Sequence, residues 1–198
     1  MGRRVVAMDM ELRPSRGGFM RPFGAGWFIR EYLLGNGPEG STRIDPERGS
    51  PQSDINYEYK VSLATATART RAEKRISQLV LNGVDVTEEM AEDIYQRELK
   101  KISHKFTRMR YHSFLKYFGT LKKLGWVEAT SETENSAMQD HYPEAPGRVY
   151  YRLTEAGRKA TDEEWSNPLF TMYPEIGASH KSRNTGWPHR KVQRNNRG

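Results

Sequence analysis

The sequence RMRYHSFLKYFGTLKKLGWVE, residues 108–128, combines aromatic and basic residues and contains no acid before Glu128. Its apolar residues recur at steps of three and four, which is the spacing of one face of a helix: Tyr111, Phe114, Leu115, Phe118 and Leu121. We therefore expect a helix over about 110–124 whose aromatic side chains lie in the core. Gly125 is its predicted C-terminal stop, because glycine readily adopts the left-handed conformation that ends helices.

The other side of this helix is basic, and no Asp or Glu occurs between Glu98 and Glu128. A run of cations that no acid interrupts creates a positive local field. We therefore expect a negatively charged partner here. The cations of the run are Lys100, Lys101, Lys105, Arg108, Arg110, Lys116, Lys122 and Lys123.

The composition favours one domain with appendages. The chain has 198 residues, of which 35% are hydrophobic, and a mean hydropathy of −0.87, which predicts a modest core with solvated segments around it. A net charge of +7 and a pI near 9.6 make nucleic acid the first partner to consider and an anionic membrane surface the second.

Several kinds of site are excluded or not indicated. The absence of cysteine excludes disulfides, thiolate zinc sites and a cysteine nucleophile. The five histidines lack metal-ligand spacing, and no glycine-rich segment follows a predicted strand as a phosphate-binding loop must. We expect no enzymatic activity, cofactor or metal. No apolar run approaches the roughly 18 residues of a membrane span, so we expect a soluble intracellular protein, cytoplasmic or nucleoid-associated, or nuclear in a eukaryote.

The N-terminal third is expected to contain an arm, a helix and a loop. Residues 1–22 combine arginines with glycine and proline, a composition typical of a flexible basic arm. FGAGWFIREYLL has apolar residues at helical offsets before the stop GNGPEG, which predicts a helix over about 24–34. The polar residues 41–54 predict a loop.

Two more helices are expected before the basic run. The first begins near Asp54 and ends before NGVD, although LATATART within it also fits a strand. The second follows Thr87, a predicted N-cap, and has acidic residues in its first turn, where they offset the helix dipole. Its apolar stripe is Ala91, Tyr95, Leu99, Ile102 and Phe106.

After Gly125 the pattern predicts a hairpin. WVEATSE and RVYYRLT are rich in β-branched and aromatic residues and flank a polar segment with two prolines, so we expect two strands with a long tip. A last helix is expected from about Thr154 to before Asn167. From Ser179 onward the chain is basic and nearly without aliphatic residues, which predicts a disordered tail.

This order of elements resembles a winged helix-turn-helix, in particular the PadR and MarR regulators. In such proteins the recognition helix ends in Leu-x-x-Leu-Gly and two hydrophobic residues, and the second wing strand continues through Tyr-x-Leu-Thr-x-x-Gly into a helix. The resemblance covers mainly residues 110–160 and implies a DNA-binding transcriptional regulator. The matching residues are Leu121, Leu124, Gly125, Trp126, Val127, Tyr151, Leu153, Thr154 and Gly157.

The expected fold is therefore mainly α (α+β): a winged helix with a two-stranded β wing, a helical insertion and flexible basic termini. The expected domain organisation is a basic arm over 1–22, the winged-helix domain over 23–178 and the tail over 179–198. Within the domain, the insertion covers about 55–106 and a long acidic wing loop covers about 133–147.

A helix that enters a major groove needs an apolar back and a basic, hydrogen-bonding front. We expect helix 110–124 to supply that front and the basic tail to add phosphate contacts. The alternative is that these charges form an ordinary solvated face. The expected nucleic-acid contacts are Lys105, Arg108, Arg110, His112, Ser113, Lys116, Tyr117, Thr120, Lys122, Lys123, Arg148, Lys181, Arg183, Arg190 and Lys191.

The wing departs from the usual basic pattern, because no Lys or Arg lies between Lys123 and Arg148. Either the wing points away from DNA, or the module binds protein. The alternative function is a non-catalytic structural subunit of a nucleoprotein or protein assembly, which binds RNA or protein through its basic arms and acidic wing. The helical insertion is a candidate surface for a homodimer or another protein partner. The acids of the wing are Glu128, Glu132, Glu134, Asp140 and Glu144.

Overall fold

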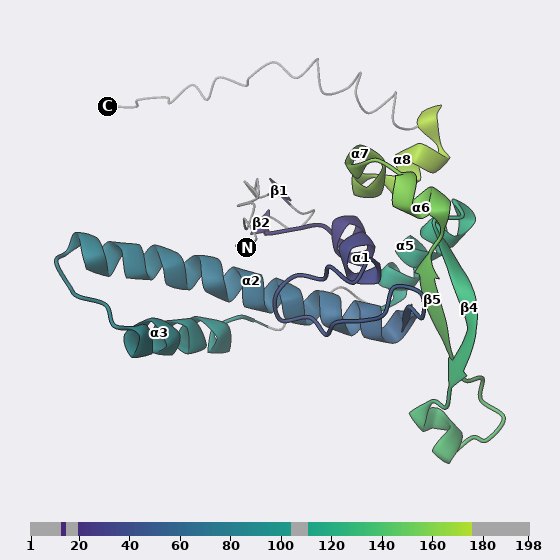
Figure 1. Ribbon diagram of the computed structural model, residues 1–198, viewed down its shortest axis with the longest axis horizontal. Helices are drawn as coiled ribbons and strands as arrows, with labels where there is room; N and C mark the ends of the chain where they lie inside the picture. The colour runs from purple at the N-terminus through teal and green to yellow at the C-terminus, as the bar shows by residue number, and fades with distance from the viewer. Residues whose placement is uncertain (1–12, 15–19, 104–110, 176–198) are drawn as a thin grey trace, which may run out of the picture.

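The computed structural model describes residues 13–14, 20–103 and 111–175 (Figure 1). It is mainly helical with a small three-stranded antiparallel sheet, which confirms the α+β class. The elements in chain order are β1 (Arg13–Pro14), β2 (Met20–Arg21), α1 (Ala25–Leu33), β3 (Ser50–Pro51), α2 (Gln52–Leu81), α3 (Glu88–Lys100), α5 (Tyr111–Lys123), β4 (Val127–Glu134), the 3-10 helix η1 (Ala137–Asp140), β5 (Arg148–Leu153), α6 (Glu155–Lys159), α7 (Asp162–Ser166) and α8 (Pro168–Met172).

The core lies where α1, the first half of α2 and α5 meet the sheet and the C-terminal helices. Burying one large apolar side chain contributes about 1.5–3 kcal/mol, so the apolar faces of these helices supply most of the stability. The prediction for Tyr111 is wrong: its side chain is 46% exposed, because the buried part of α5 begins one turn later, at Phe114. The fully buried hydrophobic residues include Phe28, Ile29, Leu33, Ile55, Leu63, Phe114, Phe118 and Leu121.

The strand β5 lies between β3 and β4, and both pairs are antiparallel. β4 and β5 form the predicted hairpin, with Val127 opposite Leu153 at one end and Glu134 opposite Arg148 at the other. The hairpin extends away from the helices (Figure 1). The β4–β5 hairpin with its connecting segment, residues 127–153, which we call the wing for brevity, is therefore a long ribbon whose base, but not its tip, packs on the core.

The third strand, β3, lies in the segment that we expected to be a loop. Ser50 pairs with Tyr151 of β5. A Cβ atom at Gly49 would lie 2.0 Å from the carbonyl oxygen of Tyr151, and Gly49 has a φ of +78°. Glycine therefore allows the chain to approach the sheet here. A strand of two residues has no periodicity, which is why the sequence pattern did not reveal it.

Polar contacts fix the segment between α1 and β3 to α2. Thr42 donates its backbone N–H and its hydroxyl to the carboxylate of Glu58, at 3.0 and 2.9 Å. Arg69 forms a bidentate ion pair with Glu39. The Glu58 side chain is buried, and a buried carboxylate needs such hydrogen bonds to offset its desolvation.

The helix α2 begins at Gln52, two residues before the predicted start, and includes the ambiguous segment 63–70. A helix of 30 residues is about 45 Å long, so its second half extends well beyond the core. Ile55 and Tyr59 pack in the core. The separate part of the predicted insertion is therefore only the second half of α2 together with α3.

The helix α3 packs beside the second half of α2 and forms a helical hairpin with it (Figure 1). Thr87 caps α3 as predicted, because its side chain accepts a hydrogen bond from the backbone N–H of Met90 at 3.3 Å. Ile94 is the buried hydrophobic residue of α3, whereas the predicted stripe is only half-buried over its described part. Phe106, its last member, lies outside the described residues.

The single helix expected from Thr154 is in fact three short helices. Thr154 caps α6, but Ala160 adopts an extended conformation (ψ 138°) that ends it. Thr161 then starts α7 with a capping box, because Thr161 and Glu164 bond each other's backbone N–H groups. Pro168 begins α8, a helix that the sequence pattern did not predict.

The two termini are described only in part. β1 and β2 lie within the predicted N-terminal arm, where Arg13 pairs with Arg21 and Pro14 with Met20. The described part of the arm therefore contains regular structure. The remainder of the arm and the predicted tail, residues 179–198, lie outside the described residues.

Candidate nucleic-acid interface

The helix α5 has a buried face and an outward polar face. Phe114, Phe118 and Leu121 are fully buried. At about 100° of rotation per residue, the polar positions gather on the opposite side, over roughly a third of the circumference. We name these residues the α5 polar face: His112, Ser113, Lys116, Thr120 and Lys123, which are exposed or, for Thr120, half-buried.

The end of α5 sets its position relative to the wing. Gly125 has a φ of +68°, and its N–H donates to the carbonyl of Lys122 at 3.0 Å. The next N–H, of Trp126, donates to the carbonyl of Leu121 at 3.0 Å. These two bonds are the Schellman motif, which confirms the predicted stop at Gly125 and sends the chain directly into β4.

The two sequence segments that carry the family resemblance contact each other. The Thr154 hydroxyl donates to the carbonyl of Gly125 at 2.5 Å and accepts from the Gly157 N–H at 3.1 Å. The Thr154 N–H donates to the carbonyl of Trp126 at 3.0 Å. A Cβ atom at Gly157 would lie 2.2 Å from that same carbonyl oxygen. Trp165 Nε1 donates to the carbonyl of Gly157 at 3.0 Å, so this junction fixes α5, the wing and α7 together.

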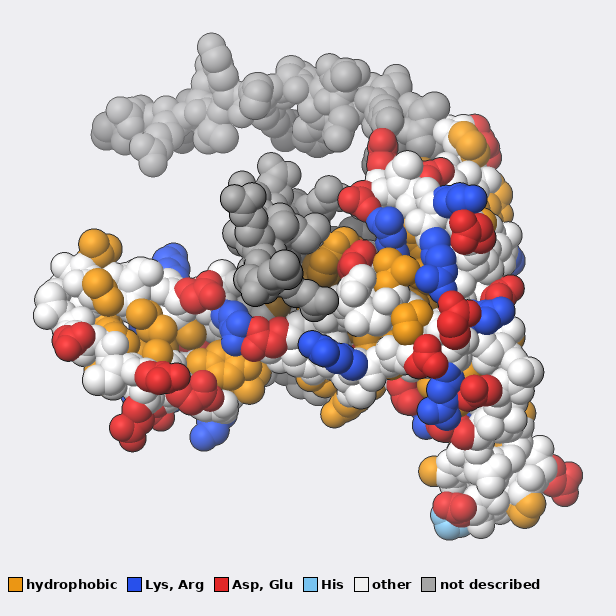
Figure 2. Space-filling model, viewed as in Figure 1, with side chains coloured by type: hydrophobic (Ala, Val, Ile, Leu, Met, Phe, Trp, Pro, Cys, Tyr) orange, Lys and Arg blue, Asp and Glu red, His pale blue; other side chains and the backbone are white. Residues whose placement is uncertain are grey.

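The acids on the wing strands are paired with arginines. Arg152 contacts Glu128 at 2.9 Å, and Arg48 contacts Glu132 at 2.6 Å. The third acid, Glu134, contacts Arg148 at 2.6 Å. Figure 2 shows Lys and Arg side chains alternating with Asp and Glu over the hairpin. The strands of the wing are therefore close to electrically neutral, although the sequence between Lys123 and Arg148 is acidic.

Tyr150 stands among these charges. Its hydroxyl donates to Glu134 at 2.6 Å, and the Arg48 guanidinium lies 4.7 Å from the centre of its ring. The hydrogen bond to the Glu134 carboxylate is the main reason that the pKa of Tyr150 is raised, since losing the proton would place two negative charges together.

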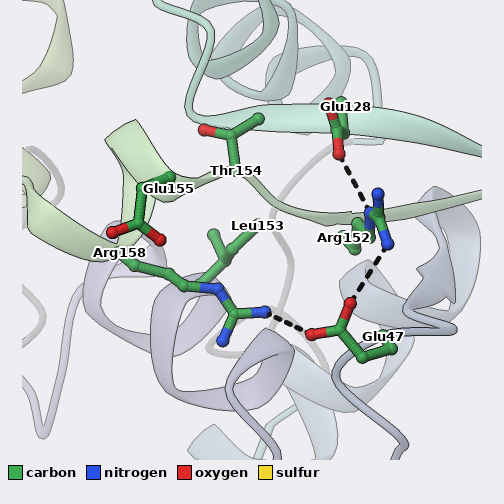
Figure 3. Close-up of a pocket in the computed structure, with 7 residues that line it drawn as sticks. All are labelled: Glu47, Glu128, Arg152, Leu153, Thr154, Glu155 and Arg158. Carbon is green, nitrogen blue, oxygen red and sulfur yellow. Dashed lines mark hydrogen bonds and ion pairs between the residues drawn. The ribbon is translucent and has the colours of Figure 1, made fainter.

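A shallow hollow of about 400 Å³ lies at the base of the wing (Figure 3). Its two arginines, Arg152 and Arg158, both contact Glu47 at 3.1 Å. Arg152 also contacts Glu128. Their positive charges are therefore already matched by carboxylates, so the hollow offers little attraction to an anion.

The tip of the wing is folded. The Ser136 N–H donates to Gln139 Oε1 at 2.8 Å, and the Gln139 N–H donates to the carbonyl of Ser136 at 2.8 Å. Gln139 Nε2 donates to the carbonyl of Ala145 at 2.8 Å. Asp140 and Glu144 are exposed, and neither forms an ion pair with a described residue. The negative charge of the wing is thus concentrated at its tip rather than along its strands.

Apart from Tyr117, the predicted site residues fall into three groups. The α5 polar face contains five of them in one place. The second group is Lys122 and Arg148. The Lys122 Nζ atom lies 5.2 Å from the centre of the Tyr151 ring. Arg148 forms ion pairs with Asp54 and Glu134. The third group lies outside the described residues: Lys105, Arg108, Arg110, Lys181, Arg183, Arg190 and Lys191.

Tyr117 requires a correction. Its side chain packs against the core, and its hydroxyl donates to the carbonyl of Trp165 at 3.2 Å. Burial raises the pKa of Tyr117. Because α7 and α8 cover this side of α5, Tyr117 supports the helix from behind and is not free to contact a phosphate or a base.

Gly119 lies in α5 and was not among the predicted contact residues. It lies at the margin of the polar face, and a Cβ atom there would meet nothing within 4 Å. Glycine inside a helix costs about 1 kcal/mol relative to alanine. The packing of the chain therefore does not explain this glycine. The signal in the sequence was a glycine inside an otherwise helical pattern.

Over the described ranges, no three His, Cys, Asp or Glu side chains lie close enough together to hold a metal ion. Within the same residues, no helix has both the length and the apolar character needed to cross a membrane. Comparisons with protein-family models, with curated proteins and with solved structures found no match.

Proposed function

We propose that the protein is a DNA-binding winged-helix protein, and in particular a transcriptional regulator, that places the α5 polar face in the major groove. The observation that carries the proposal is the contrast in charge pairing. Lys116 and Lys123 form no ion pair with any described residue, whereas the arginines of the wing strands are paired. Unpaired lysines on one face are the side chains that can neutralise phosphates and release counterions.

The arrangement of the elements supports the same proposal. α5 runs through a tight turn into the β4–β5 hairpin, which leads to a further helix, and this is the order of a winged helix. β3 adds to the hairpin from the segment after α1. The back of α5 is fully buried, so the helix is held rigidly while its polar face points outward, as entry into a major groove requires.

The side chains of the polar face suit groove contacts. Ser113 and Thr120 carry hydroxyls that can donate to or accept from base edges and phosphates, and the Lys116 ammonium can contact guanine acceptors or phosphates. Gly119 removes a side chain at the margin of the face, which allows the helix backbone to approach a partner closely. This role would account for a glycine that the fold does not need.

The wing contributes little attraction in this proposal. Its strand charges are matched internally, and Asp140 and Glu144 at the tip would be repelled by phosphates. We therefore place the tip away from the DNA. The alternative of a subunit in an RNA or protein assembly differs in one measurable respect, since it predicts a preference for structured RNA or no nucleic-acid binding.

The test is a binding titration by fluorescence anisotropy with duplex DNA and structured RNA, each at two salt concentrations. Lys116→Glu with Lys123→Glu should strongly weaken duplex binding without altering the circular dichroism spectrum. The matched control is Arg43→Glu with Lys159→Glu, because both residues are exposed and lie off the α5 polar face. The control should retain most of the affinity despite the same change in net charge.

Removing two phosphate contacts should also lower the salt slope by about 1.8, at about 0.9 per contact. Equal losses in the Lys116 and Arg43 double variants would contradict the proposal, because the effect would then depend on net charge alone. Tighter binding to structured RNA than to duplex DNA would favour the assembly alternative.

A further inference from the structure

We propose that the α2–α3 hairpin is a homodimer interface that pairs with the same hairpin of a second copy. The hairpin is residues 69–100, from the second half of α2 to the end of α3. It projects to the side away from the β4–β5 hairpin (Figure 1), so pairing through it leaves the wing uncovered. This inference is independent of nucleic-acid binding.

The first observation is that the hairpin leaves apolar side chains in solvent. Leu81 is 85% exposed, Val80 56% and Met90 40%, and Tyr95 and Leu99 are only half-buried. Figure 2 shows hydrophobic side chains gathered over α2 and α3. A contiguous exposed apolar surface of this kind marks an interaction site.

The second observation is that the hairpin buries few hydrophobic side chains. α3 has 13 residues, a length at which an isolated helix is marginal in water, so most of its stability must come from an apolar face that is covered. In α3 the one buried hydrophobic residue is Ile94. A second layer of helices over the exposed side would complete the burial, as in a four-helix bundle.

The charges indicate which partner provides that layer. Residues 69–75 carry four Lys or Arg and one Glu, whereas residues 85–93 carry five Asp or Glu and no Lys or Arg. A two-fold interface is self-complementary, because each surface meets its own copy in reverse. Antiparallel pairing would therefore place the basic segment 69–75 of each copy against the acidic segment 85–93 of the other.

Several of these charges are available for such contacts. Lys74, Arg75, Asp85 and Glu92 form no ion pair with a described residue, in contrast to Arg69, which is held by Glu39. The apolar residues lie in the hairpin between and beside the two charged segments. Opposite charges at its two ends would therefore set the register of the pair, while apolar burial provides the affinity.

The test measures the mass of the full chain by sedimentation equilibrium at micromolar concentration. The wild type should have twice the monomer mass of 22.9 kDa. Val80→Glu with Leu81→Glu should give the monomer with unchanged helicity, since both side chains are exposed. Tyr142→Glu is the control, because this exposed aromatic residue (66%) lies near the wing tip and should not affect the dimer.

A charge exchange tests the partner and its orientation. Lys74→Glu with Arg75→Glu should weaken dimerisation at least about tenfold, and so should Asp85→Lys with Glu92→Lys. Combining all four substitutions in one chain should restore the dimer, because the attraction is rebuilt with the signs reversed. A monomeric wild type would overturn the proposal and assign the surface to a different protein. A dimer that persists in the Val80 and Leu81 variant, or a combined variant that stays monomeric, would equally overturn it.

Discussion

The junction between α5 and the wing allows a quantitative prediction for Gly157→Ala. The new Cβ would lie 2.2 Å from the carbonyl oxygen of Trp126, and 3.0 and 3.1 Å from its C and Cα atoms. These are backbone atoms, so no side chain can rotate away. Since nonbonded contacts are optimal at about 3.5–4.0 Å, α6 and the start of β4 would have to separate by about 1 Å.

The energetic cost follows from the contacts that this separation disturbs. Overpacking costs about 1–3 kcal/mol. Two hydrogen bonds, Thr154 N–H to Trp126 and Trp165 Nε1–H to Gly157, contribute about 1 kcal/mol each. A gain of about 1 kcal/mol in helix propensity offsets part of the loss. The free energy of unfolding should therefore fall by about 2–4 kcal/mol, which lowers the Tm by about 4–16 °C for a chain of this size.

Thermal unfolding followed by circular dichroism would measure the effect. Gly119→Ala is the matched control, because it makes the same substitution within a helix where nothing lies within 4 Å of the new Cβ. It should raise the free energy of unfolding by up to about 1 kcal/mol. A Gly157→Ala variant with a Tm equal to or above that of the wild type would refute the argument that this glycine is required by the junction.

Three further predictions address other parts of the chain. Tyr117→Phe should lower the free energy of unfolding by about 0.5–1.5 kcal/mol, because the hydrogen bond to the carbonyl of Trp165 is lost. A change in DNA affinity would contradict the view that the Tyr117 hydroxyl makes no contact with DNA. Backbone and side-chain hydrogen bonds from Thr161 hold the pKa of Glu164 below its usual 4.5. The carboxylate therefore stabilises the fold above about pH 4.5 and loses this effect as the pH falls through its lowered pKa. Glu164→Gln should reduce the pH dependence of the urea-denaturation midpoint between about pH 5 and 3. A pH profile identical to that of the wild type would contradict the assignment. Replacing residues 135–147 with Asn-Gly should keep the fold, since Glu134 and Arg148 already face each other at the end of the hairpin. DNA binding should persist, and a folded variant that no longer binds DNA would show that the tip contacts it.

Local patterns predicted the helices and the hairpin because the forces involved are local. The steps of three and four in α5 depend only on helix geometry, and the structure buries Phe114 and Phe118 accordingly. Gly125 and Thr87 act at helix ends through bonds within one turn, so they too were predictable. The same reasoning failed after Thr154, where a continuous helix was expected and Ala160 is extended.

The position of Tyr117 could not be predicted from the sequence. Its place between core and polar face depends on α7 and α8, which begin more than 40 positions later in the chain. β3 likewise exists only because a central strand is available for two residues to join. Contacts between distant segments decide both cases.

The charge of the wing shows most clearly how local sequence patterns differ from the contacts that distant segments make. The segment between Lys123 and Arg148 contains acids and no Lys or Arg, so its composition alone predicts an acidic wing. The tertiary structure brings Arg48 to Glu132 across 84 positions, and Glu47 to Arg152 across 105. Coulomb interactions depend on distance in space rather than along the chain. The sequence therefore determined which residue types the wing contains, and only the folded arrangement decided that its strands are nearly neutral while Lys116 and Lys123 remain unpaired among the described residues.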